Sequence, residues 1–172
     1  MLTLTSMTEQ PRGRRALEIG PTGKTVADNL ARLRRQRGLT TRQLSGLLER
    51  NGRSIPASGI TRMEKGDRLV TVDELVALSV ALDVNPAMLL LPPTVEGDIQ
   101  LTGGGQVPAI KAWDWFRKDM PLRVPEGDDG SAIVEFRLNL PRGIRKFNIT
   151  TPAGRRAVFE EERGNADGQG LD

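Results

Sequence analysis

The 172-residue chain contains no cysteine, no histidine and no tyrosine. Without cysteine there is neither a disulfide framework nor a thiolate nucleophile. Without histidine the commonest general base and metal ligand is missing as well. Asp, Glu and Lys are present, but no grouping of them along the sequence suggests an active site. We therefore expect no enzyme, no metal site and no cofactor.

Long apolar runs are also missing. No stretch of 18 apolar residues exists, so we expect no membrane-spanning helix and no membrane partner. The first 15 residues, MLTLTSMTEQPRGRR, lack the apolar stretch of a secretory signal. These absences favour a cytoplasmic protein.

Positive charge is concentrated in one part of the chain. Residues 22–70 hold 11 Lys or Arg and 4 acidic residues, a net of +7. Residues 93–172 hold 11 basic and 13 acidic residues, a net of −2. A dense positive charge suits a polyanion such as a nucleic acid, although it is also compatible with an ordinary solvated surface.

Helical periodicity predicts three helices in the first part of this basic region. The first is expected over residues 26–36. Thr40 and Gln43 form a capping box at the start of the second, and Pro56 suits the first turn of the third, residues 56–65. The apolar side chains expected to be buried by these helices are Val26, Leu30, Leu33, Leu44, Leu47, Leu48, Ile60 and Met63.

Two more helices are predicted before the proline pair at 92–93. Thr71 and Glu74 form a second capping box for the fourth helix, and Asn85 with Pro86 opens a short fifth one. The side chains expected to be buried by the fourth helix are Val72, Leu75, Val76, Leu78 and Leu82.

The remainder of the chain carries weaker patterns. A helix is expected over residues 109–120, and a strand over 131–140 that pairs with 145–150 as a short β-hairpin. We therefore predict a mainly α protein: a five-helix domain followed by a small, partly disordered C-terminal region. The helical domain is expected at residues 22–92, after a flexible tail at 1–21. A linker should follow at 93–106, with Gly103, Gly104 and Gly105 as a flexible joint. We expect a small unit for dimerisation or partner binding at 107–159 and a disordered tail at 160–172.

Three stretches of the helical region resemble a known family. VADNLARLRRQRGLTTRQLSGLL, SGITRMEKGDR and TVDELVALSVALDVNPAMLL are similar to the Cro/lambda-repressor-like (XRE-type) helix-turn-helix, over residues 26–91. The resemblance implies a five-helix lambda-repressor-like domain that binds operator DNA as a homodimer and regulates transcription. A protein of this kind is expected to be associated with the nucleoid. High Arg, Gly, Pro and Ala usage suggests a GC-rich bacterial genome, and we expect an actinobacterial, phage or plasmid source.

The resemblance also assigns roles to individual positions. Arg34 and Glu64 match a structural ion pair between the first and third helices. The residues implied at base edges are Thr41, Ala57, Ser58, Thr61 and Arg62. The residues implied at backbone phosphates are Arg42, Gln43, Lys65 and Arg68.

The chemistry of these residues agrees with such roles. Arg62 can form two hydrogen bonds to guanine, although a phosphate contact alone is the alternative. Gly59 is unusual inside a helix and suggests a close approach to a DNA backbone. Two departures from the family weaken the transfer of side-chain roles. The loop at 49–54 is longer than usual, and the Gln and Asn often found at base-contact positions are absent.

Other interpretations stay open. The helical domain could instead serve a protein-interaction module, such as an antitoxin or an RNA-polymerase-associated adaptor, with its partner bound by residues 107–159. Three arginines of the N-terminal tail suit either a DNA-binding arm or a solvated segment, namely Arg12, Arg14 and Arg15. Trp113 and Trp115 suit core anchors or a stacking surface.

Overall fold

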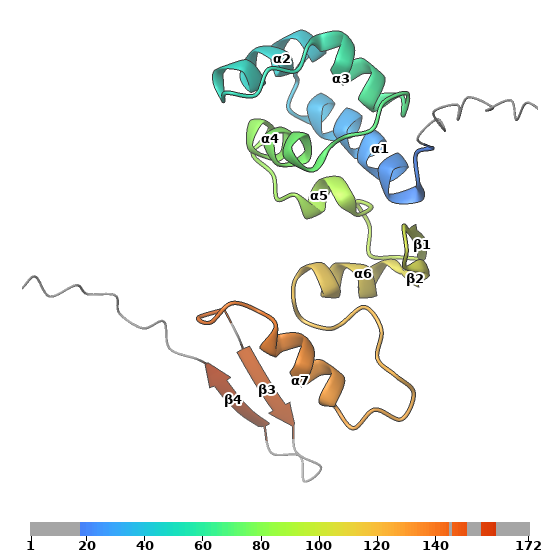
Figure 1. Ribbon diagram of the computed structural model, residues 1–172, viewed down its shortest axis with the longest axis vertical. Helices are drawn as coiled ribbons and strands as arrows, with labels where there is room; N and C mark the ends of the chain where they lie inside the picture. The colour runs from blue at the N-terminus through green and yellow to red at the C-terminus, as the bar shows by residue number, and fades with distance from the viewer. Residues whose placement is uncertain (1–17, 145, 151–155, 161–172) are drawn as a thin grey trace, which may run out of the picture. The chain divides into compact units, whose positions relative to one another are not determined.

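The computed structural model describes residues 18–144, 146–150 and 156–160 (Figure 1). The chain divides into two compact units, Met1–Leu90 and Leu91–Asp172. Most of the predicted tails lie outside the described residues, including Arg12, Arg14 and Arg15.

The first unit contains the five helices that the sequence predicts. They are α1 (Pro21–Gln36), α2 (Thr41–Arg50), α3 (Ala57–Glu64), α4 (Val72–Leu82) and α5 (Ala87–Leu90). Helix α1 packs against α3 and α5, and α2 packs against α3 and α4.

Helix α1 begins five residues earlier than the apolar pattern indicates. Pro21 occupies its first turn, where a missing N–H leaves no hydrogen bond unmade. Ile19 lies directly over Gly23, because a Cβ there would come within 2.7 Å of the Ile19 Cγ1 atom. The first turn of α1 is therefore marked by Pro21 and by the absence of a side chain at Gly23. A search for periodic apolar residues does not detect either signal.

Both predicted capping boxes are confirmed. The Thr40 hydroxyl accepts the Gln43 N–H at 3.2 Å, and the Gln43 carboxamide oxygen accepts the Thr40 N–H at 2.8 Å. Thr71 and Glu74 repeat the arrangement at 3.3 and 3.0 Å. Each box satisfies two N–H groups that the helix itself leaves unpaired, which fixes where α2 and α4 begin.

The core of the first unit draws on all five helices and on the loop before α3. Asn29, a buried polar residue of α1, donates from Nδ2 to the Leu89 carbonyl at 3.1 Å and so ties α1 to α5. Leu47 of α2, expected to be buried, is half-buried. The buried members of the core are Leu30, Leu33, Leu44, Leu48, Ile55, Ile60, Met63, Leu78, Leu82 and Leu89.

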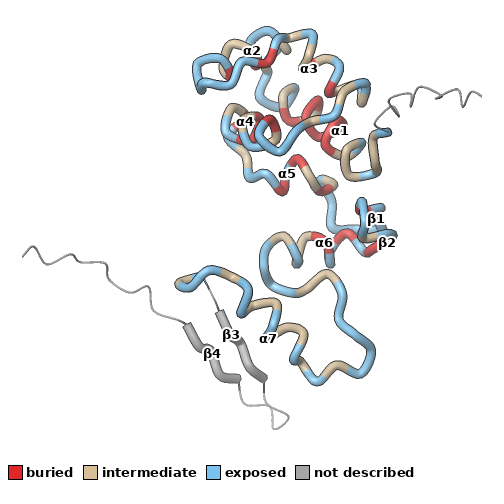
Figure 2. Tube along the Cα trace, in the orientation of Figure 1, coloured by how far each residue is buried: buried red, intermediate tan, exposed pale blue. Residues whose placement is uncertain are grey.

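Helix α4 differs from its predicted burial. Leu78 and Leu82 are buried, but Val72 is 77% and Val76 50% exposed, so the prediction that both valines are buried is wrong. Apolar residues occur all round this helix, and periodicity alone cannot tell which side faces the core. Figure 2 shows α4 with both buried and exposed segments.

The second unit begins with a β-hairpin where the sequence predicted a linker. Strands β1 (Asp98–Leu101) and β2 (Gly105–Pro108) pair antiparallel, with Leu101 opposite Gly105. Gly103 and Gly105 have φ angles of 76° and 74°, so these glycines shape a tight turn and are not a flexible joint.

Helix α6 (Ala109–Phe116) follows the hairpin, within the range that the sequence predicts for a helix. It packs with β1 and β2 around a small cluster of buried residues. Trp113 joins this cluster, and its indole N–H donates to the carbonyls of Pro92 and Thr94 at 3.1 and 3.2 Å. Trp113 is thus a core anchor, whereas Trp115 is 37% exposed.

The strand predicted over residues 131–140 is wrong. This segment forms helix α7 (Ser131–Leu138), whose N-cap is Gly130. In the turn before it, the Asp128 carboxylate accepts the Gly130 N–H at 2.8 Å and the Ser131 hydroxyl at 2.9 Å. The alternating apolar residues resemble a strand, but the turn at Asp128 leads into a helix. The hairpin lies further along, between β3 (Lys146–Thr150) and β4 (Arg156–Glu160).

Candidate nucleic-acid interface

The turn between α2 and α3 is longer than in a compact helix-turn-helix, yet it is anchored. Ile55 near its end is 2% exposed and belongs to the core. The Ser45 hydroxyl of α2 donates to the Ile55 carbonyl at 2.6 Å. The apolar anchor and the hydrogen bond fix the chain one residue before Pro56, so the position of α3 relative to α2 is set despite the extra residues.

Helix α3 presents one polar side to solvent while Ile60 and Met63 are fully buried. Ser58 and Arg62 are exposed, and Ala57 and Thr61 are half-exposed. No hydrogen bond or ion pair holds the Arg62 guanidinium within the described part of the chain. Its five N–H donors are therefore available to an acceptor outside the domain.

The Thr61 hydroxyl is already committed within the helix. It donates to the Ala57 carbonyl at 3.0 Å, one turn earlier. Towards an external ligand Thr61 can therefore offer lone pairs and a methyl group, but not its proton. The sequence places Thr61 at a base edge, and the structure adds that its hydroxyl proton is not available there.

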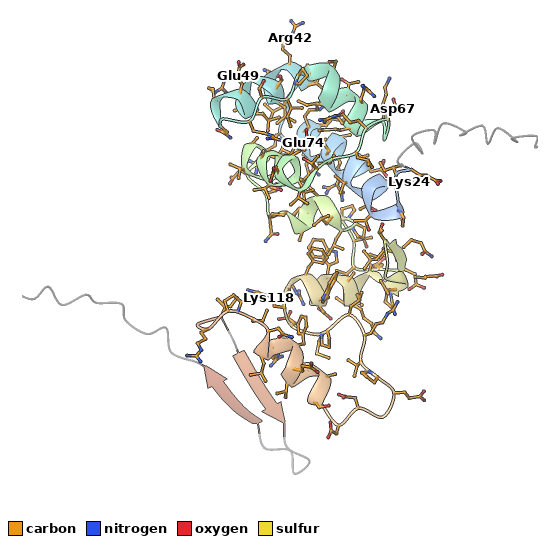
Figure 3. All side chains as sticks on the ribbon, in the orientation of Figure 1. Lys24, Arg42, Glu49, Asp67, Glu74 and Lys118 are labelled. Carbon is orange, nitrogen blue, oxygen red and sulfur yellow. The ribbon has the colours of Figure 1, made fainter. Side chains whose placement is uncertain are left out.

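The start of α2 supplies a second group of predicted residues. Arg42 is exposed and projects away from the domain (Figure 3). Thr41 beside it is half-exposed. The Gln43 oxygen is used by the capping box, so only its amide hydrogens remain to be donated outwards. Lys65, which follows α3, is exposed as well.

The structure brings Arg34 and Glu64 together. Arg34 donates from Nε and Nη2 to the two Glu64 oxygens at 2.5 and 2.8 Å, and from Nη1 to the Leu39 carbonyl at 2.7 Å. The two side chains are only 13% and 10% exposed. The hydrogen bond to Glu64 raises the pKa of Arg34, against the opposing effect of burial. The pair fastens α1 to α3 and turns the only acidic side chain of α3 inwards.

Arg68 has an arrangement that the sequence did not indicate. Its Nη2 donates to the Glu74 Oε1 atom at 2.5 Å, and the Glu74 side chain is 6% exposed. Burial would raise the pKa of Glu74, but hydrogen bonds from Thr71 and Arg68 and the Arg68 charge hold it below its ordinary value. Arg68 thus braces the capping box of α4. The two residues are six positions apart, and no local pattern links them. The phosphate contact expected of Arg68 stays a prediction.

A family model described as a helix-turn-helix domain matches residues 26–91. This segment is a helix-turn-helix domain of the XRE/Cro-like kind. Searches of curated proteins and of solved structures found no match.

The helix-turn-helix domain indicates, at a coarse level, a DNA-binding regulator. Domains of this family are typically non-enzymatic. Among the helices of the described residues, none combines the length and the apolar character needed to cross a membrane.

Proposed function

We propose that the protein is a sequence-specific transcriptional repressor that binds a two-fold-related operator as a homodimer, with α3 in the major groove. The observation that carries the proposal is the distribution of charge around α3. Arg42, Arg62 and Lys65 are exposed, whereas Glu64 is held inwards by Arg34. A face with unpaired cations and no carboxylate from its central helix suits a phosphate backbone.

The proposed roles follow from the donors and acceptors that each side chain still has. Arg62 donates to guanine O6 and N7, and Ser58 bonds a neighbouring base edge. Thr61 offers its methyl group to thymine, because its proton is held by Ala57. The residues proposed to contact phosphates are Arg42, Gln43 and Lys65, with Arg68 as a weaker contributor.

The test is selection of random duplex DNA by the full-length protein, followed by affinity measurements on the selected sites. We expect a two-fold-related consensus with half-sites about one helical turn apart. Arg62→Ala should relax preference at one base pair per half-site by about 1–3 kcal/mol.

A matched control is Arg50→Ala, which removes an exposed arginine from the far end of α2. It should leave the base preference of every position unchanged. If Arg62→Ala also leaves every preference unchanged, the assignment of Arg62 to base readout is wrong.

The same selection decides a second candidate, a protein-interaction module such as an antitoxin or a polymerase-associated adaptor. The observation in its favour is the number of apolar side chains that the second unit exposes, which include Ile110, Trp115, Val134 and Leu138. Where such side chains gather in one contiguous patch, they mark a contact surface for another protein. Weak binding without any consensus would support this candidate over the repressor.

A further inference from the structure

Helix α4 is apolar on the side that faces solvent as well as on the side that faces the core. Its only charged residues are Asp73 and Glu74, and Glu74 is 4% exposed. A helix that is hydrophobic all round is normally covered on all sides. The solvent side of α4 therefore has the composition of a contact surface.

Three valines make up this solvent side. Val72, Val76 and Val80 are 77%, 50% and 63% exposed. Residues four apart in a helix form one continuous ridge along its surface. We call these three residues the valine stripe. Beside it lies a hollow of about 340 Å³, lined by Asn51, Arg53, Asp73, Val76, Ala77 and Val80.

The charges at this hollow are self-complementary. Arg53 comes from the turn before α3, and Asp73 comes from α4. Both are exposed, and no ion pair joins either of them to a partner in the described part of the chain. One cation and one anion at the same hollow can be matched by a second copy of the same surface.

We infer that the valine stripe pairs two copies of this chain through antiparallel α4 helices related by a two-fold axis. The proposed repressor needs two copies of the chain, and α4 is the helix through which they would pair, so this inference rests on the proposed function. An antiparallel arrangement places the two hollows face to face, so that Arg53 and Asp73 of both copies share one space. A parallel arrangement would place the hollows on opposite sides of the helix pair.

The pairing is compatible with DNA binding. Arg42 projects from the α2–α3 side of the unit, whereas the stripe lies on α4 (Figure 3). A second copy seated on the stripe therefore does not need to occupy the surface that carries Arg42. The stripe is short, because 11 residues of helix extend only about 16 Å. We expect a micromolar dimer that two-fold-related DNA stabilises further.

The absence of cysteine allows a direct test by single-cysteine cross-linking of the full chain without DNA. In the antiparallel pair Val76 lies near the axis, so Val76→Cys should form a disulfide with itself under mild oxidation. Val72 faces Val80 of the other copy and lies about 12 Å from its own counterpart, at 1.5 Å per residue. A disulfide requires Cα atoms about 4.4–6.8 Å apart. Val72→Cys alone should therefore stay monomeric on a non-reducing gel, whereas a mixture of Val72→Cys and Val80→Cys chains should cross-link.

Lys24→Cys, on an exposed position of α1, is the control for random collision. Equal cross-linking of this control and of the stripe variants would overturn the inference. Strong self-linking of Val72→Cys, without linking in the mixture, would overturn the antiparallel arrangement. A chain that sediments as a dimer without linking at any stripe position would show that it pairs elsewhere.

A second variant separates the pairing from the proposed function. Val76→Glu should keep its fold, because the side chain is half-exposed, and should weaken self-association at least about tenfold by placing two carboxylates near the axis. Its affinity for an isolated half-site should be unchanged. Cross-linking through Val76 without any DNA consensus would refute the repressor and leave the pairing intact. The pairing would be refuted if the chain binds a DNA consensus as a monomer and its valine stripe is covered by its own second unit.

Discussion

At the scale of single residues, one buried and one partly buried carboxylate decide how much positive charge faces outwards. Glu64 takes up the charge of Arg34, and Glu74 takes up that of Arg68. Both arginines lie close in sequence to the proposed interface, yet the structure uses their charges internally. The free cations are fewer than the sequence count of the basic region suggests.

The sequence predicts a phosphate contact for both Arg42 and Arg68, but only Arg68 is paired with a carboxylate, so replacing each arginine should have a different effect. Arg42→Ala removes an exposed side chain and should lower the salt dependence of DNA binding by about one unit of slope without changing stability. Arg68→Ala leaves a largely buried Glu74 without its cation and should destabilise the fold by about 1–2 kcal/mol, less than for a fully buried pair because Arg68 is 34% exposed. Salt titrations of affinity and urea unfolding measure the two effects.

The two variants also serve as controls for each other. If Arg68→Ala lowers the salt slope as much as Arg42→Ala and leaves stability unchanged, then Arg68 acts mainly on a phosphate and its pair with Glu74 is dispensable.

At the scale of elements, the two helical glycines of the helix-turn-helix offer a matched comparison. A Cβ on Gly59 of α3 would lie 3.4 Å from the Ile55 side chain, and a Cβ on Gly46 of α2 would lie 3.7 Å from that of Arg50. Both sites have room for a methyl group. Each Gly→Ala change should therefore stabilise the domain by about 1 kcal/mol, measured by urea unfolding.

Their effects on DNA binding should differ. If Gly59 permits close approach to a DNA backbone, Gly59→Ala should lower affinity severalfold, whereas Gly46→Ala should not. Equal affinities for the two variants would mean that Gly59 has no role in close approach.

The start of α4 predicts a dependence of stability on pH. The pKa of Glu74 is lower in the folded chain than its ordinary value of 4.5. Its contribution to the free energy of unfolding is therefore complete above about pH 4.5 and is lost as the pH falls through the lower folded value. Unfolding measured between pH 7 and pH 3 should show this loss, and Glu74→Gln should reduce it. If Glu74→Gln loses as much stability between pH 7 and pH 3 as the unchanged chain, the loss does not come from protonation of Glu74.

The sequence predicts those elements best whose signals are local. The capping boxes at Thr40 and Thr71 lie within four residues each, and both are found where expected. The β-branched and aromatic residues of α7 predict a strand, because the hydrogen bonds that Asp128 accepts before the helix are not visible in the apolar pattern. The β1–β2 hairpin was missed, because glycines that shape a turn look the same in sequence as glycines of a linker.

Features that depend on distant contacts could not be predicted in the same way. The bond between Arg68 and Glu74 has no sequence signature, and neither has the side of α4 that turns outwards. Arg34 and Glu64, 30 residues apart, were paired only through the family resemblance. The sequence could thus assign the residues proposed for the interface to their helices. Only the structure shows which hydrogen-bond donors and acceptors of these residues are already used within the domain.

At the scale of the whole molecule, the division into two units predicts that the first is self-sufficient. A fragment of residues 1–90 contains all five helices of the helix-turn-helix domain and its whole core. It should unfold cooperatively by circular dichroism and should still cross-link through a cysteine at position 76. A fragment that is unfolded or monomeric would show that the second unit is required for folding or for pairing.

The order of the two units along the chain has a consequence for biosynthesis. The first unit is formed by residues 1–90, and the 82 residues 91–172 are among those translated after it. At about 5–20 residues per second, this takes roughly 4–16 s. Helical domains with mostly local contacts fold in microseconds to milliseconds. The nascent chain should therefore present a finished DNA-binding domain, with its valine stripe uncovered, while the ribosome is still making the second unit. Neighbouring chains on one messenger RNA could then pair before either is released.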